Sequence, residues 1–168
     1  EYGEIGEQMA VKFYSKYYDS VKNRNHNDPY NPGFDLECSQ PNFPENSLPN
    51  IKVEVKAITY DRPCIRLTQT EWKFMVRNKH HYELFIYAHE QGKYHQTIRI
   101  KKAWLTLRTI LEKLDTQEQS KYPHASKRIE AVIGLQQQES DCKCNDILIH
   151  WHRLLRDYSH QDIEKDYR

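Results

Sequence analysis

The pattern of hydrophobic and polar positions predicts a helix at the start of the chain, followed by strands. Apolar residues recur at helical spacing from Glu4 to about Tyr18, which predicts an amphipathic helix. Asn, Asp and Pro are frequent from Lys22 to Pro32, so we expect a loop there. Two alternating segments come next, from Gly33 to Cys38 and from Ile51 to Ile58. Each of these segments predicts a strand.

The middle of the chain predicts one more helix and a hairpin. A short strand is expected at Cys64 to Leu67. Thr68 lies three residues before Glu71, which is the spacing of a capping box and predicts a helix from about Gln69 to Lys79. Two aromatic and β-branched runs, 81–88 and 94–100, are joined by a short polar segment that contains Gly92. These two runs predict a hairpin.

The remainder of the chain has a helical pattern. We expect a helix from Ala103 to Leu114 and two more at about 127–137 and 145–158. The predicted fold is therefore of the α/β class, with a mixed central β-sheet flanked by helices and a C-terminal helical appendage. We place one domain at residues 1–115 and a helical extension, packed on it, at residues 116–168.

Length and charge limit what this fold can do. A chain of 168 residues that is 38% hydrophobic can bury one core and a small appendage. Lys and Arg number 25 and Asp and Glu 24, so the net charge of +1 exerts no general attraction on nucleic acid or membrane. Any binding of an anion must then come from a local group of basic side chains. Arg77, Lys79, His80 and His81 are one such group, but we favour the interpretation that they form a solvated polar turn.

Cysteine usage and hydropathy favour an intracellular protein. The four cysteines, at positions 38, 64, 142 and 144, are too few and too uneven for a secreted disulfide framework. No apolar run reaches the length of a signal peptide or a membrane span, so we expect no membrane association. The sequence begins at Glu1, already in helical pattern. We therefore expect the chain to be one domain of a longer protein and the other domains of that protein to be its partners.

The strand from Ile51 to Ile58 carries the candidate chemistry. Side chains two residues apart in a strand point to the same face, so Lys52, Glu54 and Lys56 share one side. An acid and an amine are thereby presented together over a buried floor. An ion pair on a half-exposed strand is the alternative interpretation of Glu54 and Lys56. The floor consists of the residues at the alternate positions, namely Ile51, Val53, Val55 and Ala57.

The preceding strand adds a second carboxylate. If the two strands pair, Phe34 and Leu36 face the floor and Asp35 points toward the side of Glu54. Two close carboxylates on rigid elements form a hard oxygen site for Mg²⁺ or Mn²⁺. Such a metal, with an ammonium group nearby, suits the hydrolysis of phosphodiester bonds. Glu7 would add a further carboxylate if the first helix packs across the sheet.

The order of these motifs resembles one known family. The segments are Gly6-Glu7 in a helix, Gly33-Phe34-Asp35, Val53-Glu54-Val55-Lys56, Leu67-Thr68 before Glu71-Trp72, and the strand Tyr82 to Tyr87. Together they resemble the NO VEIN C-terminal-like domain, a branch of the PD-(D/E)xK nuclease-like superfamily. The resemblance covers about residues 3 to 100 and implies a restriction-endonuclease-like fold.

The resemblance also implies a function and a set of site residues. It implies that Asp35, Glu54 and the Val55 carbonyl bind Mg²⁺ or Mn²⁺, with Glu7 as an accessory metal-binding and catalytic acid. It implies that Lys56 is the catalytic lysine. The implied activity is a metal-dependent endonuclease, with DNA favoured over RNA, in a larger restriction or defence-type protein.

Some features depart from the family pattern or leave alternatives open. Glu71 matches the helix-start acid of the family, but a capping role explains it as well. The loop between Asp35 and Glu54 is longer than a tight hairpin, and nothing after Ile100 matches. A catalytically inactive module that binds nucleic acid or protein on the same fold is the first alternative. An assembly domain that forms a homodimer through its C-terminal helices is the second.

A zinc site near the C-terminus is a separate possibility. Cys142, Cys144, His150 and His152 have the residue types of zinc ligands. Their spacing is not that of a common zinc finger, and the two histidines would diverge on a helix from 145 to 158. We therefore expect no zinc site there.

Overall fold

The computed structural model describes residues 2–25, 30, 32–40, 49–59, 64–90, 94–109, 147–150 and 161–167. Residues 103–109 are helical in addition to the labelled elements. The labelled elements, in chain order, are α1 (Tyr2–Tyr14), β1 (Ser20–Asn23), β2 (Leu36–Ser39), β3 (Ile51–Thr59), β4 (Cys64–Leu67), α2 (Gln69–Arg77), β5 (Tyr82–Glu90), β6 (Tyr94–Ile100), β7 (Ile147–His150) and β8 (Ile163–Tyr167).

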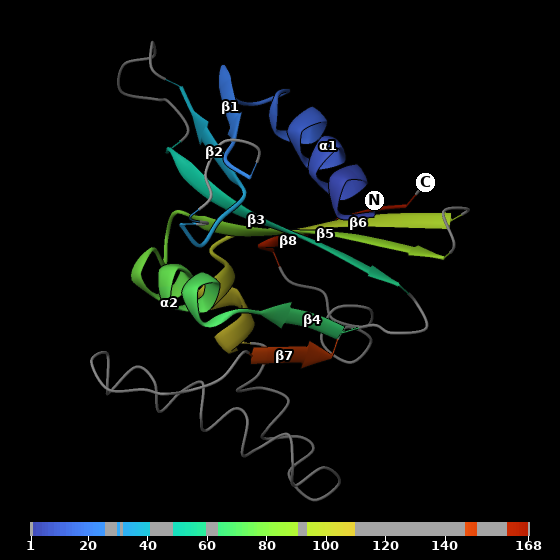
Figure 1. Ribbon diagram of the computed structural model, residues 1–168. Coiled ribbons are helices and arrows are strands. Elements are labelled where there is room, and N and C mark those ends of the chain that lie inside the picture. Colours follow the sequence, from blue (N-terminus) through green and yellow to red (C-terminus); the bar gives the residue numbers. More distant parts are fainter. Residues whose placement is uncertain are drawn as a thin grey trace, which may run out of the picture.

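The main sheet has six strands in the order β1-β2-β3-β5-β6-β8 (Figure 1). Its central pair, β3 and β5, is parallel, and its other pairs are antiparallel. β4 and β7 form a separate antiparallel pair. The predicted mixed sheet flanked by helices is therefore confirmed, as is the hairpin of β5 and β6.

Helices cover both faces of the main sheet. Figure 1 shows α1 over one face, with α2 and the helical residues 103–109 beneath the other. Two hydrophobic clusters fill these layers. The cluster under α1 includes Ala10, Tyr14, Leu36, Val53, Val55 and Phe85. The cluster on the side of α2 includes Ile65, Trp72, Met75, Tyr82, Leu84, Ile86, Ile98 and Trp104.

The alternation of β3 distributes its side chains between these layers. Ile51, Val53 and Val55 pack in the cluster under α1, which confirms these three residues of the predicted floor, whereas Ala57 is half-buried and belongs to neither cluster. Ile58 belongs to the opposite cluster, on the side of α2. Because side chains alternate along a strand, Glu54 and Lys56 also face α2. The acid and the amine of β3 therefore lie between the sheet and the first turn of α2.

The predicted capping box fixes the start of α2. The Thr68 side chain accepts a hydrogen bond from the backbone N–H of Glu71, and the Glu71 side chain accepts one from the backbone N–H of Thr68. Two N–H groups at the helix start are thereby satisfied. Parallel strands need a crossover connection, and β4 and α2 lie on the connection between β3 and β5.

Several predictions from the sequence are wrong. Ser20–Asn23 form the edge strand β1, although the loop was predicted to begin at Lys22. Ile147–His150 form the strand β7, not part of a helix, because they pair with β4. Phe34 packs in the cluster on the side of α2, away from Leu36, because β2 begins only at Leu36.

The end of the chain adds to the main sheet. β8 pairs with β6, from Gln96↔Tyr167 to Ile100↔Ile163. The expected helix at 127–137 lies outside the described residues, as do Cys142, Cys144 and His152. Among the helices that the structure describes, none is long and apolar enough to cross a membrane.

Candidate active site

Asp35 joins the start of β2 to the middle of β3. Its backbone N–H donates to the Val53 carbonyl at 2.9 Å, and its Oδ2 accepts the backbone N–H of Val55 at 2.7 Å. Backbone groups two residues apart in a strand point to the same edge, so the Val55 carbonyl faces the same edge as that of Val53. Asp35 is buried, with 4% of its surface exposed. The structure thus brings Asp35 to the edge of β3 next to Glu54.

Glu54 is a buried acid with one oxygen unpaired. Its Oε1 lies 2.7 Å from the Lys56 ammonium, and only 2% of the residue is exposed. Its Oε2 has no hydrogen-bond partner among the described residues. Burial first, and then the Asp35 carboxylate, raise the pKa of Glu54 well above its ordinary value of 4.5. When Glu54 is ionised, Lys56 pairs with its Oε1, but no hydrogen-bond donor among the described residues stabilises the negative charge at its Oε2.

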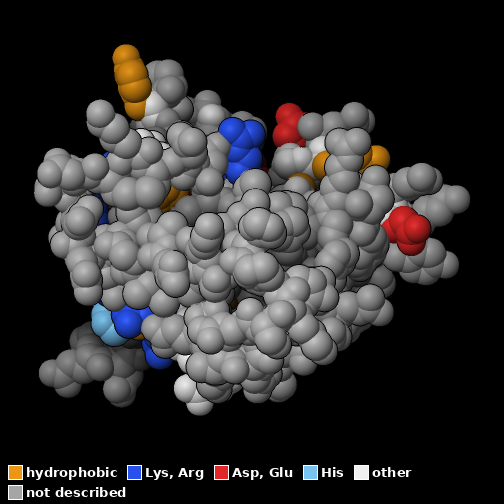
Figure 2. All heavy atoms as spheres, turned by 90° about the horizontal axis from the view of Figure 1, so that it is seen from below, with side chains coloured by type: hydrophobic (Ala, Val, Ile, Leu, Met, Phe, Trp, Pro, Cys, Tyr) orange, Lys and Arg blue, Asp and Glu red, His pale blue; other side chains and the backbone are white. Residues whose placement is uncertain are grey.

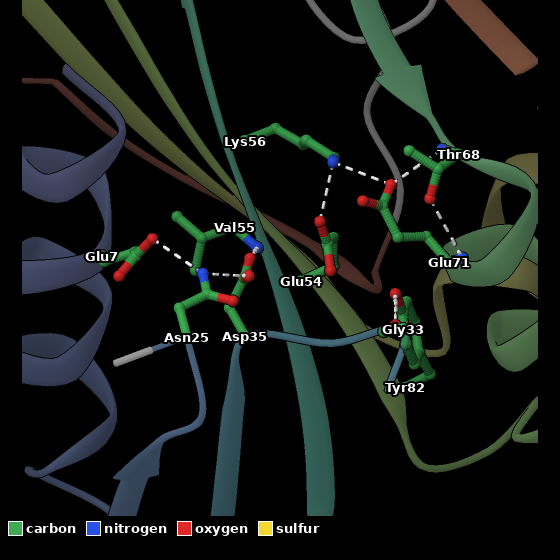
Figure 3. Close-up of polar contacts among 10 residues, drawn as sticks. All are labelled: Glu7, Asn25, Gly33, Asp35, Glu54, Val55, Lys56, Thr68, Glu71 and Tyr82. Carbon is green, nitrogen blue, oxygen red and sulfur yellow. Dashed lines mark hydrogen bonds and ion pairs between the residues drawn. The ribbon is translucent and has the colours of Figure 1, made fainter. Parts of the chain in front are cut away.

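Lys56 lies between two acids, as Figure 3 shows. Its Nζ is 2.7 Å from Glu54 Oε1 and 2.8 Å from Glu71 Oε2. Burial alone would lower the pKa of Lys56, but the two carboxylates reverse this effect and the pKa is raised. Lys56 is therefore held as an ammonium. The same Glu71 oxygen accepts the backbone N–H of Thr68 at 2.9 Å, so the capping box contacts the candidate site directly.

Glu7 is connected to Asp35 through an asparagine. The side-chain amide nitrogen of Asn25 donates to Glu7 Oε1 at 2.9 Å and to Asp35 Oδ1 at 2.5 Å. The amide of Asn23 donates to the other Glu7 oxygen at 2.8 Å. Burial raises the pKa of Asp35, whereas the N–H of Val55 and the amide of Asn25 act to lower it. α1 thus packs across the sheet so that Glu7 approaches the site, as predicted.

Gly33 and Tyr82 fix the backbone that precedes Asp35. The Tyr82 hydroxyl donates to the Gly33 carbonyl at 2.8 Å. Gly33 has a φ of 98°, and a Cβ there would lie 2.9 Å from Phe74 Cβ, so the position requires glycine. Burial, and then the nearby Glu54 carboxylate, raise the pKa of Tyr82 well above 10. This tyrosine therefore stays a neutral hydrogen-bond donor.

With this geometry in place, the family can be identified. A family model described as "Protein NO VEIN, C-terminal" matches residues 6–100, which is more than half of the 168 residues. The chain belongs to this family. Searches of curated proteins and of solved structures gave no match. The part that matches the NO VEIN C-terminal family contains each of the acids and the lysine described above.

The donor set of this NO VEIN C-terminal domain fits a divalent metal. The residues that the structure describes contain no ready-made group of three or more His, Cys, Asp or Glu ligands. They do contain the unpaired and buried Glu54 Oε2 beside a second buried carboxylate, that of Asp35. Carboxylate and carbonyl oxygens are the donors that Mg²⁺ and Mn²⁺ prefer. Asp35, Glu54 and the Val55 carbonyl could therefore hold such an ion, with Glu7 next to them.

The basic residues near α2 form a smaller feature. Arg77, His80 and His81 are exposed at the end of α2 and in the turn before β5. The carbonyl of His81 accepts the backbone N–H of Lys52 at 2.8 Å, which places this turn at the start of β3. In Figure 2 the described Lys, Arg and His side chains of the visible face lie in separate small groups. The described part of this face therefore presents no continuous basic surface.

Sequence reasoning missed two residues of the site and underestimated a third. Asn25 falls in a polar stretch where no motif distinguishes one asparagine from another. Tyr82 has the pattern of an ordinary core residue of a strand, and no signal marks its hydroxyl. The spacing of the capping box identified Glu71, but it contained no information on the contact with Lys56.

Proposed function

We propose that this NO VEIN C-terminal domain is a metal-dependent nuclease that hydrolyses phosphodiester bonds, with DNA as the favoured substrate. The observation that carries the proposal is the convergence of Asp35, Glu54 and Lys56 on one part of β3. The preference for DNA rests on the family resemblance. We further propose that the domain works inside a larger restriction or defence-type protein.

The chemistry of the three residues supports this reaction. The pKa values of Asp35 and Glu54 are raised although the Lys56 ammonium lies nearby, so a further positive charge would stabilise the ionised form of both carboxyl groups. A bound Mg²⁺ or Mn²⁺ would supply that charge, polarise the scissile phosphate and lower the pKa of a bound water. Asp35, Glu54 and the Val55 carbonyl would hold the ion.

Lys56 has a separate role in this proposal. Its ammonium is fixed at 2.7 Å from Glu54 and faces the same side of β3. In that position it can donate hydrogen bonds to a phosphate oxygen or to the attacking water, and its charge stabilises the negative charge that develops on the phosphate. Its raised pKa keeps the group charged at neutral pH.

Glu7 would assist from α1. The amide nitrogen of Asn25 donates to both Glu7 and Asp35, so the three side chains form one hydrogen-bonded chain. In this proposal Glu7 and Asn25 fix the orientation of the Asp35 carboxylate. Glu7 could also bind the metal through a water molecule.

Cleavage of defined substrates tests the proposed function. Supercoiled plasmid and a labelled single-stranded oligonucleotide are incubated with the wild type in Mg²⁺, in Mn²⁺ and in EDTA. We expect cleavage with either metal and none in EDTA. The variants Asp35→Ala, Glu54→Ala and Lys56→Ala are expected to lose cleavage while circular dichroism shows that they stay folded. Cleavage retained by all three variants would overturn the assignment.

One observation favours a second candidate function, a binding module without catalysis. Both oxygens of Asp35 already accept hydrogen bonds, and the described residues contain no three-ligand group. For a module of this kind, calorimetry would detect no binding of Mn²⁺. A gel-mobility assay would still detect binding of DNA, and the affinity for DNA would fall as the salt concentration rises. Metal-dependent cleavage by the wild type would exclude this candidate.

A further inference from the structure

Glu71 carries out two tasks with a single oxygen atom. Its Oε2 accepts the backbone N–H of Thr68 at 2.9 Å and the Lys56 ammonium at 2.8 Å (Figure 3). The side chain is 8% exposed. The first contact closes the capping box at the start of α2, which packs on the sheet. The second contact links the helix start to β3.

The Lys56 side chain needs an anchor of this kind. Lysine has a flexible stem of four carbons and a compact charge, so its position depends on the groups that surround the ammonium. In the described site these groups are Glu54 and Glu71. A carboxylate that binds a divalent cation shares its negative charge with that cation. Glu54 would then attract Lys56 less strongly, whereas Glu71 contacts the lysine from the start of α2.

We propose that Glu71 is a positioning residue, which holds the Lys56 ammonium at the reaction site from the capped start of α2. The inference rests on the proposed nuclease function and deepens it. Glu71 acts through Lys56 and contacts neither substrate nor metal. The capping box is then part of the catalytic arrangement as well as the signal that starts the helix.

The substitution Glu71→Gln separates the two tasks. The glutamine amide oxygen can still accept the N–H of Thr68, but the negative charge beside Lys56 is lost. Asn78→Ala is the matched control, because the Asn78 amide caps the other end of α2 by donating to the Phe74 carbonyl at 2.8 Å. This control weakens the same helix without touching Lys56. Glu71→Gln and Asn78→Ala are compared with the wild type under identical conditions.

NMR of the lysine ammonium groups provides a readout that does not depend on activity. In the metal-free wild type we expect one resolved ammonium signal with slow hydrogen exchange, which Lys56→Ala removes and thereby assigns. In Glu71→Gln this signal should merge with those of exposed lysines, and in Asn78→Ala it should remain. A Lys56 signal that is unchanged in Glu71→Gln would overturn the inference.

Kinetics on the plasmid substrate complete the test. We expect Glu71→Gln to lower kcat on the order of 10²-fold with little change in KM, because a small displacement of a catalytic group has an effect of this size. Asn78→Ala should keep the kcat of the wild type, and a loss of kcat in Asn78→Ala equal to that in Glu71→Gln would contradict the inference. If the wild type cleaves neither DNA substrate in either metal, the proposed function fails, while the NMR comparison still decides whether Glu71 positions Lys56.

Discussion

The backbone N–H of Val55 donates a 2.7 Å hydrogen bond to the carboxylate of Asp35. This bond extends the contact between β2 and β3 beyond their last paired residues, Leu36 and Val53. It also brings an acid from one strand next to the acid of the neighbouring strand, although about 20 residues of chain separate them. Together with the bond from the Asp35 N–H to the Val53 carbonyl, it places Asp35 beside Glu54, and the whole candidate site depends on this proximity.

Substitutions at Asp35 separate its structural role from its proposed metal-binding role. Asp35→Asn keeps an oxygen that can accept the N–H of Val55, whereas Asp35→Ala leaves that N–H unpaired. We expect the alanine variant to be less stable than the asparagine variant by about 1–3 kcal/mol, the cost of an unsatisfied buried donor. Urea unfolding in EDTA measures the difference. Equal stability of the two variants would show that the bond contributes nothing, while both are expected to lack cleavage.

The stability of the metal-free protein should depend on pH through Glu54. Its pKa in the folded protein is raised above 4.5, so its contribution to stability is fully present below pH 4.5 and is lost as pH rises through the folded pKa. Glu54→Gln mimics the neutral acid. We expect this variant to gain stability relative to the wild type as pH rises above 4.5, reaching about 1 kcal/mol near neutral pH, a typical gain when a functional site is relieved of strain.

Urea unfolding of both proteins between pH 4.5 and 8, in EDTA, measures this gain. The comparison is made as a difference at each pH, which removes the contributions of other titrating groups. A difference that stays constant over this range would contradict the raised pKa of Glu54. Addition of Mg²⁺ should stabilise the wild type more than Glu54→Gln, because the ion binds to the folded site.

Gly33 is predicted to tolerate no side chain. A Cβ at this position would lie 2.9 Å from Phe74 Cβ and 3.0 Å from the Thr70 carbonyl, and its φ of 98° disfavours other residues. We expect Gly33→Ala to cost about 1–3 kcal/mol through backbone strain. Gly3→Ala in α1 is the matched control, since nothing lies within 4 Å of its Cβ position. Thermal unfolding should show a loss for the first variant and none for the second.

The other face of the sheet contains an ion pair with a structural role. Arg99 Nε donates to Glu83 Oε2 at 2.6 Å, and the Tyr14 hydroxyl donates to the same oxygen at 2.7 Å. We expect Arg99→Ala to cost about 3–5 kcal/mol, because it leaves the buried Glu83 carboxylate without its positively charged partner. Glu164→Ala removes a half-exposed partner of the same arginine and should cost less than about 1 kcal/mol. Similar losses for both variants, measured by urea unfolding, would contradict this assignment.

The sequence alone was sufficient to predict the parts of the fold that follow from local patterns. The alternation of β3 predicted which side chains form the floor, and the spacing of Thr68 and Glu71 predicted the start of α2. These features depend on neighbours within four residues along the chain. Strand pairing also predicted that Asp35 would approach Glu54. The position of Asp35 does not follow from alternation along a strand, because Phe34 and Leu36 lie in opposite clusters and the backbone N–H of Val55 holds the Asp35 carboxylate.

The features that sequence reasoning missed depend on partners far along the chain. β1 is a short polar strand whose composition is that of a loop, and only its pairing with β2 makes it a strand. Ile147–His150 has an apolar run too short to distinguish a strand from a helix, and pairing with β4 decides its structure. The contact of Glu71 with Lys56 likewise depends on where α2 packs against the sheet.

A calorimetric titration of Mn²⁺ into the metal-free wild type and into Glu54→Gln tests the central claim most directly, since it needs no knowledge of the substrate. Asp35 and Glu54 are proposed to share the ion, and Glu54 Oε2 has no other partner among the described residues. We predict saturable binding to the wild type, and loss of that binding in Glu54→Gln while the variant remains folded. Identical binding isotherms for the two proteins, or no binding to the wild type, would contradict the proposed metal site.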